Sequence, residues 1–226
     1  MRRPGGTTTA ALERAVHRYR SAPLVARAMV HGRAFLSDLA FVDRYVPRHG
    51  FVVDLGCGHG LFANLLTEAS ASRRVLGIDI DERKVEIART TIQGRESIRF
   101  EQGDIVHEAI PTCDAVTIID VLYLLAPSDQ EAVLRKAAAA LAENAPLVVK
   151  TQERSATPRY ALTYAQELVT HSLGLTRRNA SRFHFLSRPE AHALFERTGF
   201  LLDVIDMPGR PYTDVVYLAR KAPATR

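Results

Sequence analysis

The chain has little cysteine and lacks any long apolar run. Cys57 and Cys113 alone can form neither a disulfide framework nor a four-ligand metal site. No stretch approaches the ~20 apolar residues of a membrane-spanning helix. The N-terminal segment MRRPGGTTTAALER opens on two arginines but holds no apolar segment of the kind found in a secretory signal. These features predict a protein of a reducing, cytoplasmic compartment with no membrane span.

Two further patterns are missing. No HxxxH, CxxC or pair of acids with an asparagine stands out, so we expect no metal. The formal net charge is +5, but no dense basic run is interleaved with aromatic residues, which argues against nucleic-acid binding. A positive field still suits an acidic partner, such as a metabolite bound to an acidic carrier protein.

The 226 residues, 46% of them hydrophobic, suffice for one domain with an appendage. Strand-like apolar segments alternate with helical ones, which predicts a parallel sheet covered by helices. The expected strands are 51–54, 74–78, 98–102, 115–119, 146–150, 201–207 and 213–220, and the expected helices are 60–69, 82–92, 128–142 and 188–198. Asp81 is a predicted N-cap, and Ser187 with Glu190 predicts a capping box whose helix stops at Gly199.

Residues 1–46 precede this alternation and are interpreted as a tail and a helical cap. Proline, glycine and threonine predict disorder over residues 1 to about 10. From Ala10 to Tyr45, apolar residues recur at helical spacing, and Pro23 is expected at the first position of a helix.

The segment FVVDLGCGHGLF, residues 51–62, is the most informative part of the chain. An apolar run ends at Asp54, and three glycines then alternate with other residues. Glycine suits a tight strand-to-helix turn because it tolerates positive φ and lets a ligand approach the backbone. The dinucleotide-binding fingerprint GxGxxG is the main competitor, but it requires a glycine where this chain has Leu61.

Two carboxylates follow this turn in the sequence. Asp79 closes the apolar run Val75–Ile78, and a carboxylate at the end of a second strand can accept hydrogen bonds from both hydroxyls of a ribose. Asp104 follows the strand-like segment 98–102, where a side chain can accept from the amino group of an adenine. The turn and the two acids together match the outline of S-adenosylmethionine.

On these motifs the chain resembles the class I S-adenosylmethionine-dependent methyltransferases over residues 47–221. The resemblance implies an α/β, Rossmann-like, doubly wound seven-stranded sheet, mostly parallel with the last strand antiparallel, and N-terminal helices over the cofactor mouth. It also implies S-adenosyl-L-methionine as cofactor, with the glycine turn under its methionine moiety and S-adenosyl-L-homocysteine as product. The implied cofactor-binding residues are Asp54, Gly56, Cys57, Gly58, Asp79, Ile80, Gly103, Asp104, Ile105 and Asp120.

Tyr19, in the predicted cap, is a further candidate for cofactor binding. Its position suggests that it reaches the carboxylate of the cofactor through a neighbouring arginine, Arg18 or Arg20. This hypothesis rests on position in the cap alone.

Residues 151–186 interrupt the alternation after the fifth strand. A helix is expected after Pro158, and the segment also carries Tyr160, Tyr164 and His171. We interpret it as a helical lid over the acceptor pocket, and a plain packing insertion is the alternative.

Methyl transfer from a sulfonium is an in-line displacement, so the enzyme mainly positions the acceptor and excludes water. In the resembled family the residues after the fourth strand line the acceptor, which makes Asp120 and Tyr123 catalytic candidates; Asp120 can instead cap the next turn. Tyr123 replaces the histidine that related sequences often carry, which counts against base catalysis there. His184 is the leading candidate for a general base, although its alternation with Phe183 and Phe185 also allows it to face solvent.

The sequence therefore favours a methyltransferase acting on O or N of a small molecule or carrier-bound metabolite, with a lipid-like acceptor included, in a monomer or homodimer. An RNA methyltransferase is one alternative, but the chain lacks an Asn/Asp-Pro-Pro-Tyr motif after the fourth strand. A non-catalytic S-adenosylmethionine-binding subunit is another. Loss of the glycines or of Asp79 would mark such a subunit, and the chain keeps both.

Overall fold

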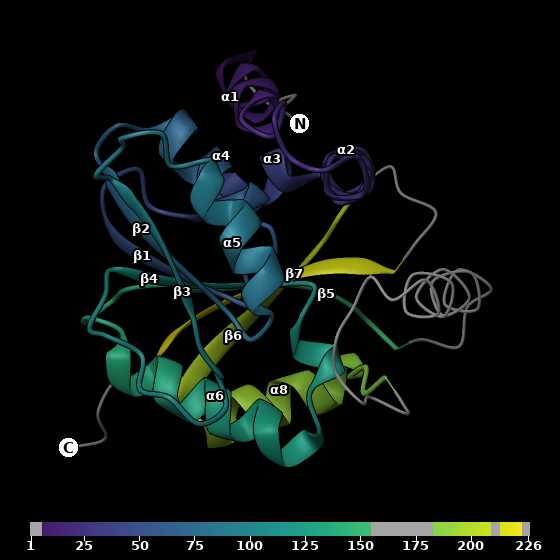
Figure 1. Cartoon of the computed structure of the whole chain (residues 1–226). Helices are drawn as coiled ribbons and strands as arrows, with labels where there is room; N and C mark the ends of the chain where they lie inside the picture. Colours follow the sequence, from purple (N-terminus) through teal and green to yellow (C-terminus); the bar gives the residue numbers. More distant parts are fainter. Residues whose placement is uncertain (1–5, 155–182, 209–212, 223–226) are drawn as a thin grey trace.

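A computed structural model describes residues 6–154, 183–208 and 213–222. Its centre is a seven-stranded sheet of strand order β3-β2-β1-β4-β5-β7-β6 (Figure 1). The strands are β1 (Gly50–Leu55), β2 (Arg73–Asp79), β3 (Ile98–Gln102), β4 (Ala115–Ile119), β5 (Leu147–Gln152), β6 (Phe200–Asp206) and β7 (Asp214–Lys221). Strands β1 to β5 pair in parallel, and β7 pairs antiparallel with β5 and β6. The predicted Rossmann-like sheet with an antiparallel final strand is confirmed.

Helices cover both faces of this sheet (Figure 1). One face carries α1 (Gly6–His17), α2 (Leu24–Leu36), α3 (Leu39–Val42), α4 (Leu61–Ala69) and α5 (Glu82–Thr90), and the other carries α6 (Pro127–Ala140) and α8 (Arg188–Arg197). Two buried apolar clusters follow from this arrangement, one on each face. Because both faces of the central strands are covered, β4 and β5 are buried throughout, as is usual for parallel sheets.

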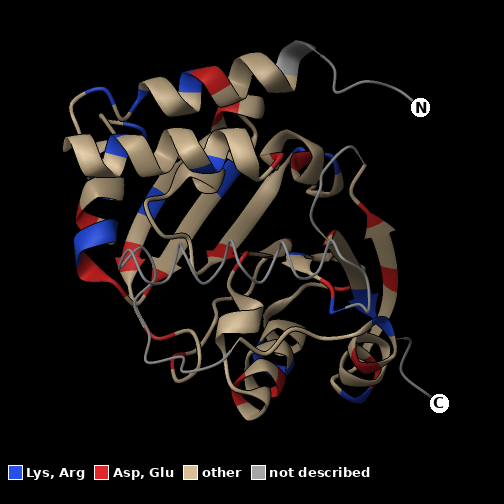
Figure 2. Ribbon diagram, turned by 90° about the vertical axis from the view of Figure 1, so that its right-hand side faces the viewer, with Lys and Arg blue, Asp and Glu red and all other residues tan. Residues whose placement is uncertain are grey.

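The direction of strand progression reverses between β1 and β4. The parallel register sets Asp54 of β1 opposite Gly77 of β2 and Thr117 of β4. The carboxyl ends of these strands therefore share one edge of the sheet, and open α/β sheets bind ligands in the crevice at such a point. Figure 2 shows acidic positions gathered at the ends of the central strands.

The N-terminal region departs from two expectations. Helix α1 begins at Gly6 rather than near residue 10, and Thr8 in this added turn is only 6% exposed. Tertiary packing here overrides the weak helix preference of the threonines. Pro23 is the N-cap of α2 rather than its first helical residue.

A buried ion pair ties the segment after α2 to the sheet. Arg73 of β2 is fully buried and its Nη1 donates to Asp43 Oδ1 at 2.6 Å. Asp43 begins η1 (Asp43–Tyr45), and Arg73 Nη2 also donates to the carbonyl of Val46 at 2.7 Å. Removing one partner of a buried pair is strongly destabilising, so this contact fixes how the N-terminal helices approach the sheet.

The predicted N-cap of α5, the capping box of α8 and its terminal glycine are confirmed. The Asp81 side chain accepts from the Arg83 amide at the start of α5, and Ser187 and Glu190 form the capping box of α8. Gly199 follows α8 with a φ of +89°. The expected lid falls mostly on residues 155–182, outside the described residues, and Tyr160, Tyr164 and His171 lie there. None of the helices described is both long and apolar enough to cross a membrane.

Candidate functional site

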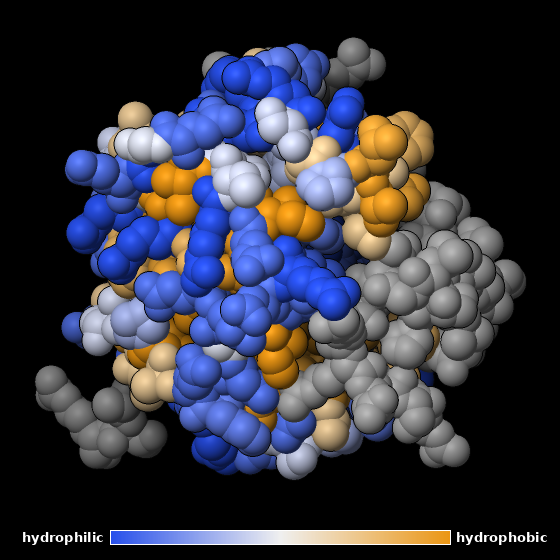
Figure 3. Space-filling model, in the orientation of Figure 1, coloured by the Kyte–Doolittle hydropathy of each residue, from blue (hydrophilic) through white to orange (hydrophobic). Residues whose placement is uncertain are grey.

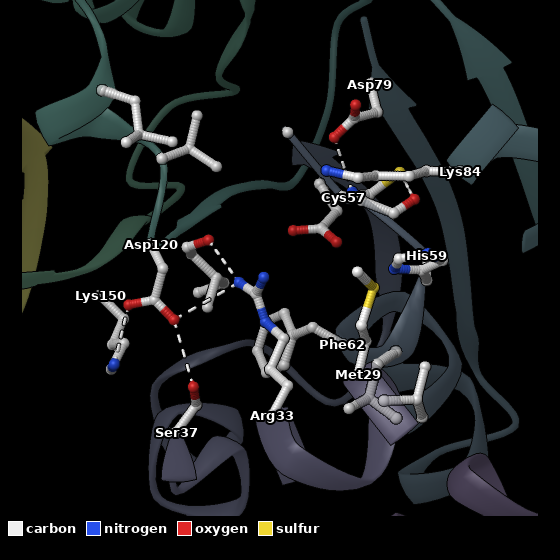
Figure 4. A pocket seen from close by; sticks show the side chains of 18 of the residues that line it. Met29, Arg33, Ser37, Cys57, His59, Phe62, Asp79, Lys84, Asp120 and Lys150 are labelled. Atoms are coloured by element: carbon white, nitrogen blue, oxygen red, sulfur yellow. Dashed lines mark hydrogen bonds and ion pairs between the residues drawn. The ribbon is translucent and has the colours of Figure 1, made fainter. Parts of the chain in front are cut away.

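A cavity of about 600 Å³ opens at the carboxyl ends of the central strands, next to α2 (Figure 4). We name its two ends by residues that line them. The cofactor half comprises Asp54, Gly58, Asp79, Gly103 and Asp104, and the acceptor half comprises Ser37, Asp120, Tyr123, Lys150 and Asp214. Arg33 of α2 lies between Asp120 and the glycine turn in Figure 4.

The glycine turn brings bare backbone to the cofactor half. Gly56 and Gly58 have φ of +73° and +56°, which glycine adopts without strain. A Cβ at Gly56 would lie 2.5 Å from a methyl group of Val121, so packing forbids a side chain there. At Gly58, in contrast, a Cβ would meet nothing within 4 Å. Gly58 lines the cavity, so a ligand can approach its backbone directly.

Asp54 supplies a buried carboxylate with one unsatisfied oxygen. Its Oδ1 accepts from Thr117 Oγ1 at 2.6 Å, while Oδ2 has no hydrogen-bond partner among the described residues. Burial raises the pKa of Asp54 to about 6, although the Thr117 hydrogen bond opposes this shift. A buried polar atom without a partner is costly. The cavity-lining Asp54 is therefore suited to a ligand that brings a hydrogen-bond donor, above all a cationic one.

Asp79 bridges the glycine turn and the end of β2. Its Oδ2 accepts from the Gly58 amide at 2.7 Å and its Oδ1 accepts from the Asp81 amide at 2.9 Å. Both oxygens keep lone pairs for further donors. Asp79 and Ile80 both line the cavity, and Ile80 is 44% exposed, which leaves an apolar surface beside the carboxylate.

Asp104 lies at the far end of the cofactor half with Gly103 and Ile105. Its Oδ1 accepts from the Val106 amide at 2.9 Å, which holds the loop after β3 in a turn. The Gly103 amide donates to the carbonyl of Asp79 at 3.0 Å, so this loop is joined to the end of β2. The two predicted acids thus line one cavity.

Asp120 organises the acceptor half. It has a φ of +58°, which is uncommon for a residue other than glycine. Its Oδ1 accepts from Lys150 Nζ at 2.8 Å, and its Oδ2 lies 3.3 Å from Ser37 Oγ and 3.4 Å from Arg33 Nη2. Figure 4 shows these side chains pointing toward one another. Asp120 therefore faces the cavity and connects α2 to the ends of β4 and β5.

Lys150 is a buried cation between two carboxylates. Besides Asp120, it contacts Asp214 Oδ2 at 3.4 Å, and only 2% of its surface is exposed. Burial alone would lower the pKa of Lys150, but the carboxylates of Asp120 and Asp214 outweigh burial and raise it. Lys150 is thus held as an ammonium.

Tyr19 is buried behind the glycine turn, where its hydroxyl donates to the carbonyl of His59 at 2.6 Å and accepts from Asn64. Burial raises the pKa of Tyr19, so it stays protonated. It is not among the residues that line the described cavity, so a cofactor contact there would be indirect.

The backbone of His184 is fixed beside η2 (Leu122–Leu124). Its amide donates to the carbonyl of Tyr123 at 2.8 Å, and its carbonyl accepts from Gln130 at 3.0 Å. Among the described residues Tyr123 lines the cavity, whereas His184 does not. The ring of Tyr123 stacks on that of Phe185 at 4.7 Å. The predicted role of His184 as a base is untested by this geometry and stays a prediction.

Cys57 and His59 belong to the turn itself and line the cavity. Burial raises the pKa of the Cys57 thiol well above its usual value, so the side chain is neutral. Burial, helped by the nearby Lys84, lowers the pKa of His59 to about 4. At neutral pH neither side chain adds a charge to the cofactor half.

Sequence reasoning missed Arg33. The arginines that it favoured lie elsewhere: Arg18 pairs with Glu68 at 2.5 Å, and Arg20 contacts His17 at 2.9 Å. Arg33 Nη2 instead donates to the carbonyl of Ile119 at 2.7 Å at the end of β4.

A signal for Arg33 exists in the sequence. Met29, Arg33 and Ser37 recur every four residues, so they share one face of α2, and all three line the cavity. An arginine within such a stripe, on a helix expected to cover the mouth, was detectable in principle.

Within the described ranges 6–154, 183–208 and 213–222, no cluster of three or more His, Cys, Asp or Glu is arranged to hold a metal ion. The fold and the cavity define a Rossmann-like α/β protein with a cavity at the switch point of its sheet.

Comparison with known proteins finds similarity to methyltransferases. Residues 52–144 match the model of a methyltransferase domain. An uncharacterized RNA methyltransferase of Streptomyces avermitilis is 37% identical over 90 residues, which are 39% of this chain and 20% of that protein. A trans-aconitate 2-methyltransferase of Acidovorax sp. (strain JS42) is 37% identical over 75 residues, which are 33% of this chain and 27% of that protein. The matched segment thus spans less than a third of either relative.

The fold is also similar to that of CalO1, a methyltransferase in calicheamicin biosynthesis whose crystal structure is an S-adenosylhomocysteine-bound form. The TM-score is 0.66 with 13% identity, over 96% of this chain and 69% of CalO1. Residues 52–144 thus match a methyltransferase domain, and the fold is that of S-adenosylmethionine-dependent methyltransferases.

Proposed function

We propose that this protein transfers the methyl group of S-adenosylmethionine to O or N of a small molecule or carrier-bound metabolite. The cofactor supplies a methyl group on a sulfonium, whose leaving group is already activated. The residues of the chain then have to hold cofactor and acceptor in line and keep water out. The apolar walls of the cavity, which include Val25, Met29 and Leu124, support an acceptor with an apolar body.

The cofactor half offers a partner for each polar part of S-adenosylmethionine. Asp79 accepts from the ribose hydroxyls, and Asp104 accepts from the adenine amino group. The free oxygen of Asp54 accepts from the α-amino group beside the open face of Gly58. Arg33 donates to the carboxylate with nitrogens other than the Nη2 that holds Ile119.

The proposal rests mainly on one observation. Asp54, whose buried Oδ2 has no hydrogen-bond partner among the described residues, lines the same cavity as Gly58, where a Cβ would meet nothing within 4 Å. A zwitterionic amino-acid group would satisfy that oxygen and occupy that space. A dinucleotide has no ammonium group to offer at this position.

The RNA methyltransferase relative raises a second acceptor class. The apolar lining beside α2 favours a small acceptor over a polynucleotide, whose phosphates would require a basic approach to the cavity. The carrier partner, the cytoplasmic setting and the state as monomer or homodimer remain predictions from the sequence. Activity on a transcript with no activity on any small acceptor would replace the proposed acceptor class while keeping the cofactor.

Isothermal titration of the purified protein with S-adenosylhomocysteine tests the proposal, with NAD as the control ligand. We expect micromolar binding of S-adenosylhomocysteine alone. Asp79→Asn keeps the size of the side chain but loses its charge, so binding should weaken by about 10- to 100-fold, the usual worth of hydrogen bonds to a charged group. Asp203→Asn makes the same chemical change at an exposed position of β6 and should leave binding unaltered.

Two results would overturn the proposal. One is preference for NAD, and the other is equal loss of binding in Asp79→Asn and Asp203→Asn. A thermal melt of each variant separates loss of a contact from loss of the fold.

A further inference from the structure

The acceptor half is charged at its floor and apolar at its walls. The floor comes from the ends of β4, β5 and β7, which place Asp120, Lys150 and Asp214 together. The walls include Val25 and Leu36 of α2, which are 68% and 37% exposed. Figure 3 shows apolar side chains on the surface over α2. An acceptor that fits both features has an apolar body and one polar end.

The floor has a surplus of negative charge. Lys150 carries one positive charge and contacts two carboxylates, those of Asp120 and Asp214, at 2.8 and 3.4 Å. Arg33 lies 3.4 Å from Asp120, but in the proposed function it also serves the carboxylate of the cofactor. With the cofactor in place, the polar end of the acceptor therefore meets a surface that favours hydrogen-bond donors.

A carboxylate acceptor would need a cation at this floor. The Lys and Arg side chains among the described lining residues are Arg33, Lys84 and Lys150, and each already lies within 4.0 Å of an aspartate. An added carboxylate would be repelled by Asp120 and Asp214 without gaining a cation of its own. An amine or hydroxyl can instead donate to Asp120.

We propose that the acceptor is an apolar molecule whose reacting group is an amine or a hydroxyl, recognised by Asp120, and that carboxylates are rejected. This inference rests on the proposed function and names its substrate class. In the transfer, a lone pair of the acceptor N or O forms a bond to the methyl carbon. The bond from carbon to sulfur breaks, and its electron pair stays on sulfur. The proton of the acceptor passes to the Asp120 carboxylate and then to water, while Lys150 is a positioning residue that orients Asp120.

The test uses three probes that share a naphthalene ring and differ only in their polar group: 2-naphthylamine, 2-naphthol and 2-naphthoate. Each is titrated into the full chain saturated with S-adenosylhomocysteine, and binding is followed by naphthyl fluorescence. We expect the amine and the alcohol to bind at least about tenfold more tightly than the carboxylate. Equal or tighter binding of 2-naphthoate overturns the proposal.

The variant Asp120→Asn tests the named residue. It keeps the size of the side chain, so binding of 2-naphthylamine should weaken by about tenfold or more, while binding of 2-naphthoate should tighten. Asp203→Asn, exposed on β6, is the matched control and should preserve the order of the three probes. An unchanged order in Asp120→Asn overturns the role of Asp120.

The two proposals fail in distinguishable ways. If the proposed function is wrong, S-adenosylhomocysteine does not bind in the first titration. If only the acceptor class is wrong, S-adenosylhomocysteine binds normally and 2-naphthoate is the preferred probe. A thermal melt of Asp120→Asn with saturating S-adenosylhomocysteine tests whether the variant is folded.

Discussion

The two halves of the cavity are built in different ways. The cofactor half takes its residues from the ends of β1, β2 and β3 and from the turns that directly follow. The acceptor half joins the C-terminal end of α2 to the ends of β4, β5 and β7: Ser37 contacts Asp120 and Asp214 contacts Lys150, although the two residues are far apart in the sequence. One half is local in sequence and the other is not.

The two halves also differ in how their polar groups are satisfied. Asp54 in the cofactor half keeps a buried oxygen without a described partner. In the acceptor half, Asp120 has Lys150, Ser37 and Arg33 within 3.4 Å. The cofactor half therefore has a buried carboxylate oxygen that a ligand can satisfy, and the acceptor half holds a network of charged side chains. Changes in the first should mainly alter cofactor affinity, and changes in the second should mainly alter acceptor choice.

The largest expected effect is that of Gly58→Ala. Its Cβ projects into the cavity and occupies space meant for the ligand, so binding of S-adenosylhomocysteine should weaken by about 10- to 100-fold, the range of an overpacked site. An alanine held at the positive φ of this position should lower the free energy of unfolding by about 1 kcal/mol. Calorimetric titration and a chemical unfolding curve measure the two effects.

Gly94→Ala is the matched control for this change. Gly94 also has a positive φ, +78°, and a Cβ there would meet nothing within 4 Å, but it does not line the cavity. It should lose similar stability and keep full affinity. Similar affinity loss in both variants would refute the role given to Gly58.

The next effect concerns Arg33, at the border between the halves. Arg33→Gln should weaken binding of S-adenosylhomocysteine by about 10- to 30-fold, because a hydrogen-bonded charge pair with the cofactor carboxylate is lost. Binding of 5′-deoxy-5′-methylthioadenosine, which lacks the amino-acid part, should not change.

Arg27→Gln, on the same helix but outside the described lining of this cavity, serves as the control for Arg33. If Arg33→Gln weakens both ligands equally, Arg33 holds α2 in place and does not contact the carboxylate.

A smaller, pH-dependent effect is expected at Asp54. Because burial raises its pKa to about 6, the folded state retains a proton over the range from about pH 4 to 6 that the unfolded state gives up. The contribution of Asp54 to the stability of the wild type should thus fall as the pH rises through this range, by an amount on the order of 3 kcal/mol. Asp54→Asn has no such proton, so its stability relative to the wild type should increase between pH 4 and 8.

The substitution Asp54→Asn should weaken cofactor binding, although it should increase stability relative to the wild type. At pH 8, Asp54→Asn should bind S-adenosylhomocysteine about tenfold more weakly, because a charged acceptor for the ammonium group is lost. The affinity of the wild type should decline as the pH drops below about 6, where Asp54 becomes protonated. A stability difference that is flat from pH 4 to 8 would contradict the unsatisfied buried carboxylate.

The smallest effect is expected for Ser37→Ala in the acceptor half. It removes a 3.3 Å hydrogen bond to Asp120, which should cost about 1 kcal/mol of stability. Affinity for S-adenosylhomocysteine should stay within about threefold, a change of less than 1 kcal/mol. A loss as large as that of Gly58→Ala would abolish the distinction between the two halves.

The comparison explains how much could be predicted from the sequence. Asp79 and Asp104 end strands whose apolar runs are easily recognised, and the glycine turn needs no distant partner. That these residues line one cavity could be predicted, because the carboxyl ends of parallel strands meet at the same edge of the sheet. Arg33 was missed because its importance depends on how α2 lies against β4, which only tertiary packing sets. The start of α1 was misjudged for the same reason, since the extra turn before residue 10 holds Thr8, whose burial depends on tertiary packing.

The most direct test of the division into two halves is a crystal structure with S-adenosylhomocysteine bound. We predict that its adenosine lies along Asp79 and Asp104. Its amino group should lie within hydrogen-bond distance of Asp54 Oδ2 and its carboxylate beside Arg33, with Asp120 and Lys150 left open to the acceptor. An amino-acid group bound instead against Asp120 and Lys150, with the Asp54 oxygen still unpaired, would contradict this division.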